Sequence, residues 1–479
     1  MIHETLESLR KALADAGVIG HEAGAGKTEL AKVRDTLIDD LIRTGVFSSD
    51  EKTRDAARDA IHVLARQCGA IPCSIQGLYE AIGRGELKPT FTVPAHNIRT
   101  MTYDICRRLF RAAIRNDVGP FIFEIARSEI GYTEQRPAEY AACVLAAAVK
   151  EGYQGPVFIQ GDHFQASVKR WTGGEKEKEQ KAIEALIDEA LAAEFYNIDI
   201  DTSTLVDLSQ PTIPEQQRPN FEGTAHFTRY IREREPKGIE VSIGGEIGEV
   251  GKSNTSPEEF RAYIDGFRKL VPAGTKGVSK VSIQTGTSHG GVVMPDGSIA
   301  KVSIDFGTLR TISDVARSEY GIGGAVQHGA STLSEDVFDE FPKADTLEIH
   351  LATAFQNMVY DHPSFPSELH DEIADWCRAN LASERKEKDT EEQFVYKSRK
   401  KALGPFKRRI WDLPSDRKEA ILDDIEKKFA FLMDKLGVYG TKEIIQNFVS
   451  TEASASRPEF SSRAALQPLS ALVVEGEGE

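Results

Sequence analysis

An acid and an imidazole stand at the end of an apolar segment in the run PVFIQGDH. Residues 157–159 are strand formers, and Asp162 and His163 follow them within a few positions. Burying two ionisable groups at a strand end costs several kcal/mol unless they are paired or bound to a metal ion. The run therefore indicates either a helix cap followed by a structural histidine, or chemistry placed at the end of a strand.

The same kind of apolar run recurs along the chain, and most of the runs end in polar residues. Five of the eleven histidines lie at or just beyond the ends of eight such runs, although the runs make up a small part of the sequence. Structural histidines are not expected to gather in this way, so the run ends are predicted to form one site. The runs span residues 91–97, 120–126, 156–163, 197–203, 239–248, 278–286, 323–329 and 346–353.

The segments between these runs carry apolar residues three or four positions apart, which is typical of amphipathic helices. Eight alternations of strand and helix within about 260 residues favour an α/β fold, a (β/α)8 TIM barrel, over an open doubly wound sheet. No glycine-rich GxGxxG follows the first run, so a dinucleotide fold has no support. The active site of such a barrel lies at the carboxyl ends of the strands, where these acids and histidines fall.

Four segments are predicted along the chain. Residues 1–88 form a helical N-terminal extension, 89–381 the (β/α)8 catalytic domain and 382–450 a helical C-terminal extension. Residues 451–479 are small and polar with an acidic end, which is typical of a flexible tail.

The composition argues against several classes of partner. A formal net charge of -16 over 479 residues disfavours nucleic-acid binding, which needs an excess of Lys and Arg. The five cysteines include no CxxC pair, and no window approaches the roughly 18 apolar residues that span a bilayer. The N-terminal residues do not have the pattern of a signal peptide. We therefore expect a cytoplasmic protein with reduced thiols, without a nucleic-acid partner and without membrane contact.

Three of the histidines come from different runs and would meet above the barrel. As neutral imidazoles, His163, His289 and His328 would surround one divalent ion, an arrangement that zinc uses in catalytic sites with an open position. Glu246 is either a fourth ligand or an alternative resting ligand. Such an ion acts as a Lewis acid on a carbonyl or enediolate oxygen.

Residues next to these histidines have types that suit the same chemistry. Gly290 and Gly329 directly follow two of them and let the backbone approach a bound anion or sugar oxygen closely. Asp162 precedes His163 and is predicted to take or give a proton at a hydroxyl near the metal without binding the metal. Proton transfer beside a metal-polarised carbonyl is the chemistry of aldol cleavage and of some sugar epimerisations.

An ordered set of motifs lies between about residues 90 and 380. The motifs are GDHF (161–164), DIDTS (199–203), GGEIGEVG (244–251), GTSHGG (286–291), QHGAS (327–331) and EIHLAT (348–353). As an ordered set they resemble the class II, zinc-dependent ketose-bisphosphate aldolases, the fructose- and tagatose-bisphosphate aldolase family. The resemblance implies a (β/α)8 barrel, a homo-oligomer (dimer or tetramer), Zn2+ or another divalent ion, and a small-molecule sugar or sugar-phosphate substrate.

The resemblance also implies roles for single residues. It makes His163, His289 and His328 the zinc ligands, Asp162 the general acid/base, and Glu246 a glutamate near the metal. The positions that correspond to the substrate-binding part of the site are Asn97, Asp201, Gly290, Gly329, Ser331, His350 and Thr353.

The chain departs from the family pattern at the substrate end of the site. His350 stands where the family usually has an asparagine, and Ala126 where many members have a serine. The family also has a lysine shortly after the sixth-strand HG, whereas this chain reads GVVMP. We expect the metal chemistry to be retained and the substrate to be altered.

Three functions remain open at this point. The first is metal-dependent, reversible cleavage of a ketose (bis)phosphate between C3 and C4 through a zinc-stabilised enediolate. The second is C4 or C3 epimerisation of a ketose or ketose phosphate on the same scaffold, which the absent lysine favours. The third is a non-catalytic partner subunit of an aldolase, with the helical prefix as its docking element.

Overall fold

Eight parallel strands close into a barrel in the computed structural model of the protein, which describes residues 1–18, 31–248, 253–286, 304–331 and 333–455. The strands follow one another around the barrel in chain order, and the last strand pairs with the first. The predicted (β/α)8 barrel is confirmed, because each of the eight apolar runs contains one strand. The barrel strands are β2 (Val93–Asn97), β3 (Ile122–Ala126), β4 (Gly155–Gln165), β5 (Asn197–Asp201), β6 (Ser242–Gly248), β7 (Lys280–Ile283), β8 (Ala325–Gln327) and β9 (Glu348–Leu351).

Helices cover the outside of this barrel, since parallel strands bury both of their faces. The helical elements from β2 to just past β9 are α6 (Thr102–Arg115), α7 (Arg127–Tyr132), α8 (Pro137–Glu151), α9 (Val168–Thr172), α10 (Lys176–Ala192), η2 (Ser203–Leu205), α11 (Ile213–Arg232), α12 (Pro257–Leu270), α13 (Phe306–Tyr320), η3 (Glu335–Val337), α14 (Glu340–Lys343) and α15 (Thr353–Tyr360). Local sequence sets their ends: Ser256 caps α12 and Pro257 opens it, whereas Gly152 ends α8 in the left-handed region at φ 73°.

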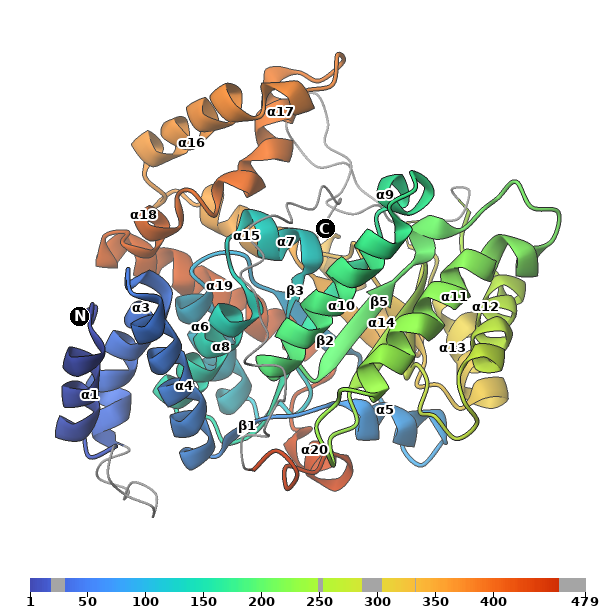
Figure 1. Ribbon diagram of the computed structural model, residues 1–479, viewed down its shortest axis with the longest axis horizontal. Coiled ribbons are helices and arrows are strands. Elements are labelled where there is room, and N and C mark those ends of the chain that lie inside the picture. Colours follow the sequence, from blue (N-terminus) through green and yellow to red (C-terminus); the bar gives the residue numbers. More distant parts are fainter. Residues whose placement is uncertain (19–30, 249–252, 287–303, 332, 456–479) are drawn as a thin grey trace.

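The N-terminal extension packs on the outside of the barrel. Its helical elements α1 (Leu6–Asp15), η1 (Val33–Leu37), α3 (Ile38–Phe47) and α4 (Glu51–Gln67) form a layer, and α3 and α4 contact α8. Figure 1 shows this layer in blue at one side of the molecule. The helices expected here are present, so the extension is helical as predicted.

The end of this extension adds a short strand to the sheet, which the helical pattern of the sequence did not indicate. The short strand β1 (Ala70–Pro72) pairs in parallel with the start of β4, from Gly155 to Val157. The pairing is tertiary and only three residues long, so no local periodicity marks it. Helix α5 (Gln76–Gly83) follows and lies at the lower end of the molecule in Figure 1, close to α20 (Lys442–Phe448).

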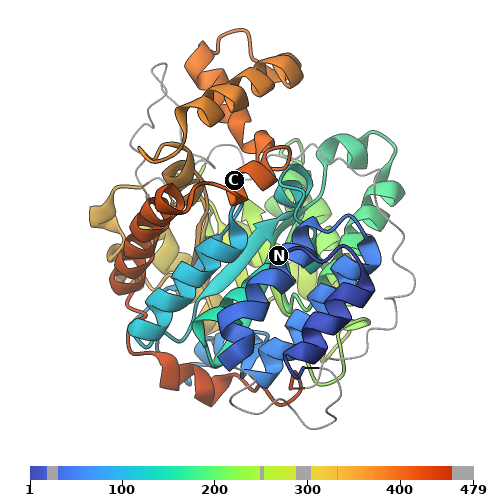
Figure 2. The same ribbon diagram turned by 90° about the vertical axis from the view of Figure 1, so that its left-hand side faces the viewer.

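The C-terminal extension is helical as predicted and has two parts. Figures 1 and 2 both show the first part as a lobe that projects beyond α7 and α15. The second part is α19 (Ser415–Lys435), which packs along α6. The lobe begins with α16 (Ser367–Asn380), which lies before the predicted start of the extension at residue 382. It continues with η4 (Ala382–Glu384), α17 (Glu391–Ser398), η5 (Arg399–Ala402) and α18 (Lys407–Trp411).

Ion pairs of the buried Arg108 connect α19 to α6 on the outside of the barrel. Arg108 of α6 is buried and lies 2.8 Å from Asp423 and 3.1 Å from Glu426.

In the described part of the chain, no helix is both long and apolar enough to cross a membrane. Most of the predicted tail, residues 456–479, lies outside the described residues.

Candidate active site

A bulge at the end of β4 positions Asp162 and His163. The pairing of β4 with β5 shifts register between Gly161 and Phe164, and His163 adopts φ 40°, a left-handed conformation that is rare for a residue with a side chain. Gly161 is required because a Cβ there would collide with the Phe164 ring. Consecutive strand residues normally face opposite sides, so the bulge lets both side chains reach the same site.

His163 joins residues from three further strands at the carboxyl ends of the barrel. Its Nδ1 lies 3.0 Å from Glu246 Oε2 on β6 and 3.2 Å from Asp201 Oδ2 on β5. Its Nε2 lies 2.6 Å from Nδ1 of His328, which directly follows β8. Ser282 Oγ lies 2.9 Å from the other ring nitrogen of His328 and so orients that ring. We call His163, Asp201, Glu246 and His328 the upper group.

The upper group has the donor set of a metal site. One ligand atom each from His163, Glu246 and His328 lie within 4.8 Å of one another, and all three residues are buried. Imidazole nitrogens and a carboxylate suit zinc and similar divalent ions. Nearby, neither carboxylate oxygen of the fully buried Asp162 accepts a well-oriented hydrogen bond from the described residues. The residues present therefore fit a divalent cation.

Electrostatics at His163 point the same way. Burial lowers the pKa of His163, but the carboxylates of Asp162 and Glu246 outweigh burial and raise that pKa well above its ordinary value. The surroundings of the imidazole thus favour positive charge, which a divalent ion also supplies. The third predicted imidazole ligand, His289, and the predicted substrate residue Gly290 lie outside the described residues.

The carboxylate of Asp201, a predicted substrate residue, contacts the His163 ring. Besides His163, its carboxylate accepts hydrogen bonds from Gln165 Nε2 at 2.5 Å and from Ser203 N at 3.0 Å and Oγ at 2.7 Å. Burial raises the pKa of Asp201, but these hydrogen bonds and His163 lower it below its ordinary value. A carboxylate on the far nitrogen of a ligating histidine fixes its tautomer and orientation. The residue pattern DTS, with an acid two positions before a serine, indicates local hydrogen bonds of the kind that Ser203 makes with Asp201.

A second charged group fills the barrel interior below Asp162. His350 on β9 stacks on the His328 ring at 4.0 Å, and its Nδ1 lies 3.0 Å from Glu124 Oε2 and 3.3 Å from Asp162 Oδ1. Its Nε2 lies 2.7 Å from Glu348 Oε1. Burial lowers the pKa of His350, but Glu124 and Asp162 outweigh burial and raise that pKa well above its ordinary value.

Lys280 neutralises the lower part of this interior. Its Nζ lies 2.8 Å from Gln160 Oε1 and 2.9 Å from Asp199 Oδ2, and it also pairs with Glu348. Burial raises the pKa of Asp199 to about 6, despite the opposing effect of Lys280. The members of this lower group are Tyr79, Glu124, Gln160, Asp199, Lys280, Glu348 and His350.

The lower group also gathers metal-ligating residue types, but it carries its own cation. Two sets, Asp162 with His328 and His350, and Asp199 with Glu348 and His350, meet the same 4.8 Å criterion. In the second set, the ammonium of Lys280 pairs with Asp199 and Glu348 and offsets their charge, so a cation is already present there. Sequence reasoning missed Glu124, Gln160, Lys280 and Glu348, although each is a polar residue inside an apolar strand run.

The remaining predicted substrate residues spread around the mouth of the barrel. Asn97 at the end of β2 donates a 2.7 Å hydrogen bond to Glu129, and Glu129 pairs with Arg99 at 2.6 Å. Asn97 therefore belongs to a buried group that is distinct from the upper and lower groups. Gly329 directly follows His328 at φ 65°, a conformation that glycine adopts without strain. Ser331 lies two residues further along, and Thr353 is the buried first residue of α15.

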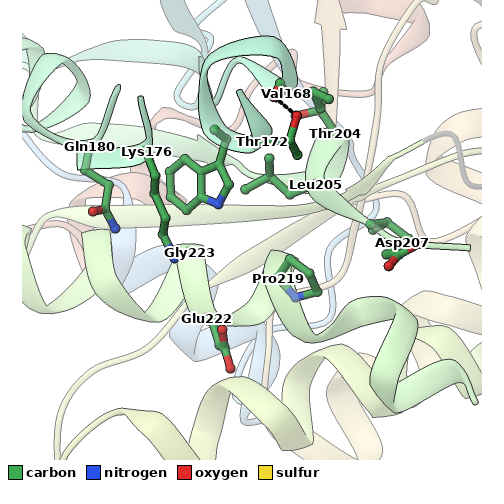
Figure 3. A pocket seen from close by; sticks show the side chains of 12 residues that line it. Val168, Thr172, Lys176, Gln180, Thr204, Leu205, Asp207, Pro219, Glu222 and Gly223 are labelled. Atoms are coloured by element: carbon green, nitrogen blue, oxygen red, sulfur yellow. Dashed lines mark hydrogen bonds between the residues drawn. The ribbon is translucent and has the colours of Figure 1, made fainter. Parts of the chain in front are cut away.

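A cavity of about 460 Å³ lies behind the upper group, between α9, α10 and α11. Figure 3 shows the side chains of Leu205 and Pro219 around it, with Lys176 and Glu222 also at its walls. Trp171 lines it as well. The Thr204 hydroxyl in its wall donates a 2.8 Å hydrogen bond to the Ala166 carbonyl, in the segment after β4. None of the predicted site residues that the structure describes lines this cavity, so it is separate from the catalytic mouth.

Comparison with known proteins gives one family match. Residues 87–410, more than half of the chain, match the family described as fructose-bisphosphate aldolase class-II. No curated protein matches the chain.

Several solved structures share the fold at low sequence identity. Fructuronate-tagaturonate epimerase UxaE from Cohnella laeviribosi is 12% identical, with a TM-score of 0.53 over 86% of this chain and 90% of that one. A probable tagatose 6 phosphate kinase from Sinorhizobium meliloti 1021 is 15% identical, with a TM-score of 0.50 over 76% of this chain and 96% of that one. The YdjI aldolase from Escherichia coli K12 is 13% identical, with a TM-score of 0.46 over 78% and 100%.

Proposed function

Because the chain belongs to the class II fructose-bisphosphate aldolase family, we propose that it is a metal-dependent lyase that reversibly cleaves a ketose (bis)phosphate between C3 and C4. The observation that carries the proposal is the position of Asp162, one residue from His163 and against the group of metal-ligating side chains. The proposed setting is the cytoplasm, and the proposed assembly is a homo-oligomer.

The upper group and His289 are the proposed metal-binding residues. His163 and His328, with His289, would hold the ion, and Glu246 would be a further or resting ligand. A bound divalent ion supplies Lewis-acid polarisation of carbonyl and hydroxyl oxygens. Asp201 keeps the His163 ring in its ligating orientation.

Asp162 is the proposed proton carrier. Its carboxylate takes the proton of the substrate hydroxyl on C4, the C3–C4 bond breaks, and the C4 fragment leaves as an aldehyde. The electron pair of the broken bond passes towards the C2 carbonyl, and a proton later added at C3 completes the ketone product. In the synthetic direction the same steps run backwards, with Asp162 returning the proton.

Cleavage assays test the proposal directly. Fructose and tagatose bisphosphates, their monophosphates and the free ketoses would be incubated with the protein as prepared, after chelation, and after zinc is restored. Triose release that chelation abolishes and zinc restores is expected. Activity that survives complete metal removal, or no cleavage of any phosphorylated ketose, contradicts the proposal.

Epimerisation of a ketose or its phosphate at C4 or C3 is the second candidate. The observation that favours it is the substrate end of the site, where His350 contacts Asp162 and Ala126 replaces the serine of many family members. The matched epimerase UxaE also covers 86% of this chain, a span that includes sequence outside the family match. Proton NMR of the reaction mixture distinguishes the two, since an epimerase forms an epimer without free triose.

A further inference from the structure

Tyr79 reaches the barrel interior from outside the eight-fold repeat. It lies on α5, in the N-terminal extension, yet its side chain is fully buried. Its hydroxyl donates a hydrogen bond to Glu348, the first residue of β9. A buried tyrosine hydroxyl aimed at a carboxylate inside a barrel is more than packing, because a phenylalanine would fill the same volume.

Glu348 connects Tyr79 to the residues below Asp162. Gln160 Nε2 donates to Glu348 Oε1 at 3.2 Å, Lys280 pairs with the same carboxylate, and His350 Nε2 lies 2.7 Å from it. His350 stands two residues further along β9 and so lies on the same face of the strand, one layer closer to the carboxyl ends. A continuous chain of contacts therefore runs from Tyr79 through Glu348 and His350 to Asp162.

Three sets of contacts define how the His350 ring faces Asp162. The Glu348 contact holds its Nε2 edge, stacking on His328 at 4.0 Å and 22° fixes the ring plane, and the Nδ1 edge is left facing Asp162 and Glu124. Loss of the Tyr79 hydroxyl removes one of the donors that fix the Glu348 carboxylate. A displaced Glu348 would move the imidazole, and with it the carboxylate of Asp162.

We propose that Tyr79 is a positioning residue for Asp162 and acts through Glu348 and His350. The inference rests on the proposed function, in which Asp162 carries the substrate proton. It assigns the N-terminal extension a part in the chemistry. Residues at the amino-terminal ends of the strands would then set the geometry of Asp162 at the carboxyl ends. Small displacements of a catalytic group are costly, which is why such support is needed.

The test compares Tyr79→Phe with Tyr153→Phe in the zinc-loaded, full-length protein. Tyr153 is also buried and also donates one hydrogen bond, at 3.0 Å to the Pro156 carbonyl, outside this chain of contacts. Tyr79→Phe is expected to lower kcat about 10-fold, the size of one hydrogen bond to a charged group, with KM and zinc content unchanged. Tyr153→Phe is expected to leave all three unchanged. Equal kcat for Tyr79→Phe and wild type overturns the proposal.

A double-mutant cycle separates positioning from a structural role. If Tyr79 acts through Asp162, adding Tyr79→Phe to Asp162→Asn causes no further loss in kcat. If Tyr79 only supports the fold, the loss is the same about 10-fold in both backgrounds, and the proposal fails.

Nitrogen-15 NMR of the histidine side chains gives a readout that needs no turnover. The His350 signals, identified by their loss in His350→Asn, are expected to shift in Tyr79→Phe and to stay in place in Tyr153→Phe. If the wild-type protein cleaves and epimerises no ketose, the proposed function fails, and these spectra alone decide the inference: a shift supports the Tyr79–His350 connection, and unchanged signals overturn it.

Discussion

The upper and lower groups of the barrel both contain histidines and carboxylates, yet only the lower group includes a lysine. Both combine histidines with carboxylates, and both are buried. The lower group includes Lys280, which stays charged because Asp199 and Glu348 surround it. In the upper group, the carboxylates of Asp201 and Glu246 face the imidazole of His163, which can lose its proton to a binding ion. The ammonium of Lys280, rather than the types of ligand present, is the difference between the two groups.

The largest expected difference lies between two neighbouring residues of the upper site. His163→Ala removes a ligand and is expected to lose bound zinc together with activity. Asp162→Ala is expected to keep zinc and to lower kcat at least about 1,000-fold, because the proton carrier is gone. Metal analysis and steady-state kinetics of both variants check this. Variants that both retain zinc and turnover would make the β4 bulge structural.

Removal of the fixed cation of the lower group is expected to affect stability rather than metal binding. Lys280→Met leaves Glu348 and Asp199 without their buried ammonium partner, which costs about 3–5 kcal/mol of unfolding free energy. Denaturant unfolding measures the loss, and zinc analysis of the folded protein should find an unchanged content. The control is Lys276→Met, at a half-exposed lysine that pairs with Glu80 at 2.8 Å. A stability like that of wild type would contradict our account of the lower group.

Asp199 makes the lower group sensitive to pH. Burial raises its pKa in the fold to about 6, so the folded state binds this proton more tightly than the unfolded chain. The stability that follows from this is fully present below the unfolded pKa near 4 and is lost as the pH rises through about 6. Asp199→Asn removes the titration and is expected to flatten the pH dependence between pH 4 and 8 by roughly 3 kcal/mol. The unfolding free energy of both proteins would be measured across that pH range. The same change with pH in variant and wild type would contradict the role of Asp199.

The smallest expected effect concerns the support of His163. Asp201→Asn keeps the shape of the side chain and removes the charge at the far nitrogen of the ring, so zinc affinity is expected to fall about 10–100-fold. Competition with a zinc chelator measures the affinity. Asp207→Asn is the matched control, because Asp207 makes the same kind of local bond to a serine two residues on, at an exposed position. An unchanged zinc affinity for Asp201→Asn would place Asp201 outside the metal site.

Sequence patterns predicted much of the barrel and the upper group, and little of the lower group. Residues such as Asp162, His163 and Glu246 end apolar runs, and parallel strands bring their carboxyl ends to one rim, so they could be assigned to one site. Lys280 and Glu348 lie inside such runs, where a single polar residue does not by itself predict a site. Their partners come from β4, β5 and α5, and no spacing in the sequence connects them.

The amino-acid sequence by itself determined the alternation of strands and helices, and with it the barrel, because hydrophobic periodicity is local. It also determined which polar residues stand at strand ends. Only the tertiary structure decided that His163 lies against Glu246 and His328 whereas His350 lies against Glu124 and Asp162, since these neighbours come from other strands. It also decided that Tyr79 of the N-terminal extension belongs to the barrel interior, because β1 pairs with β4 and places α5 at the closed end.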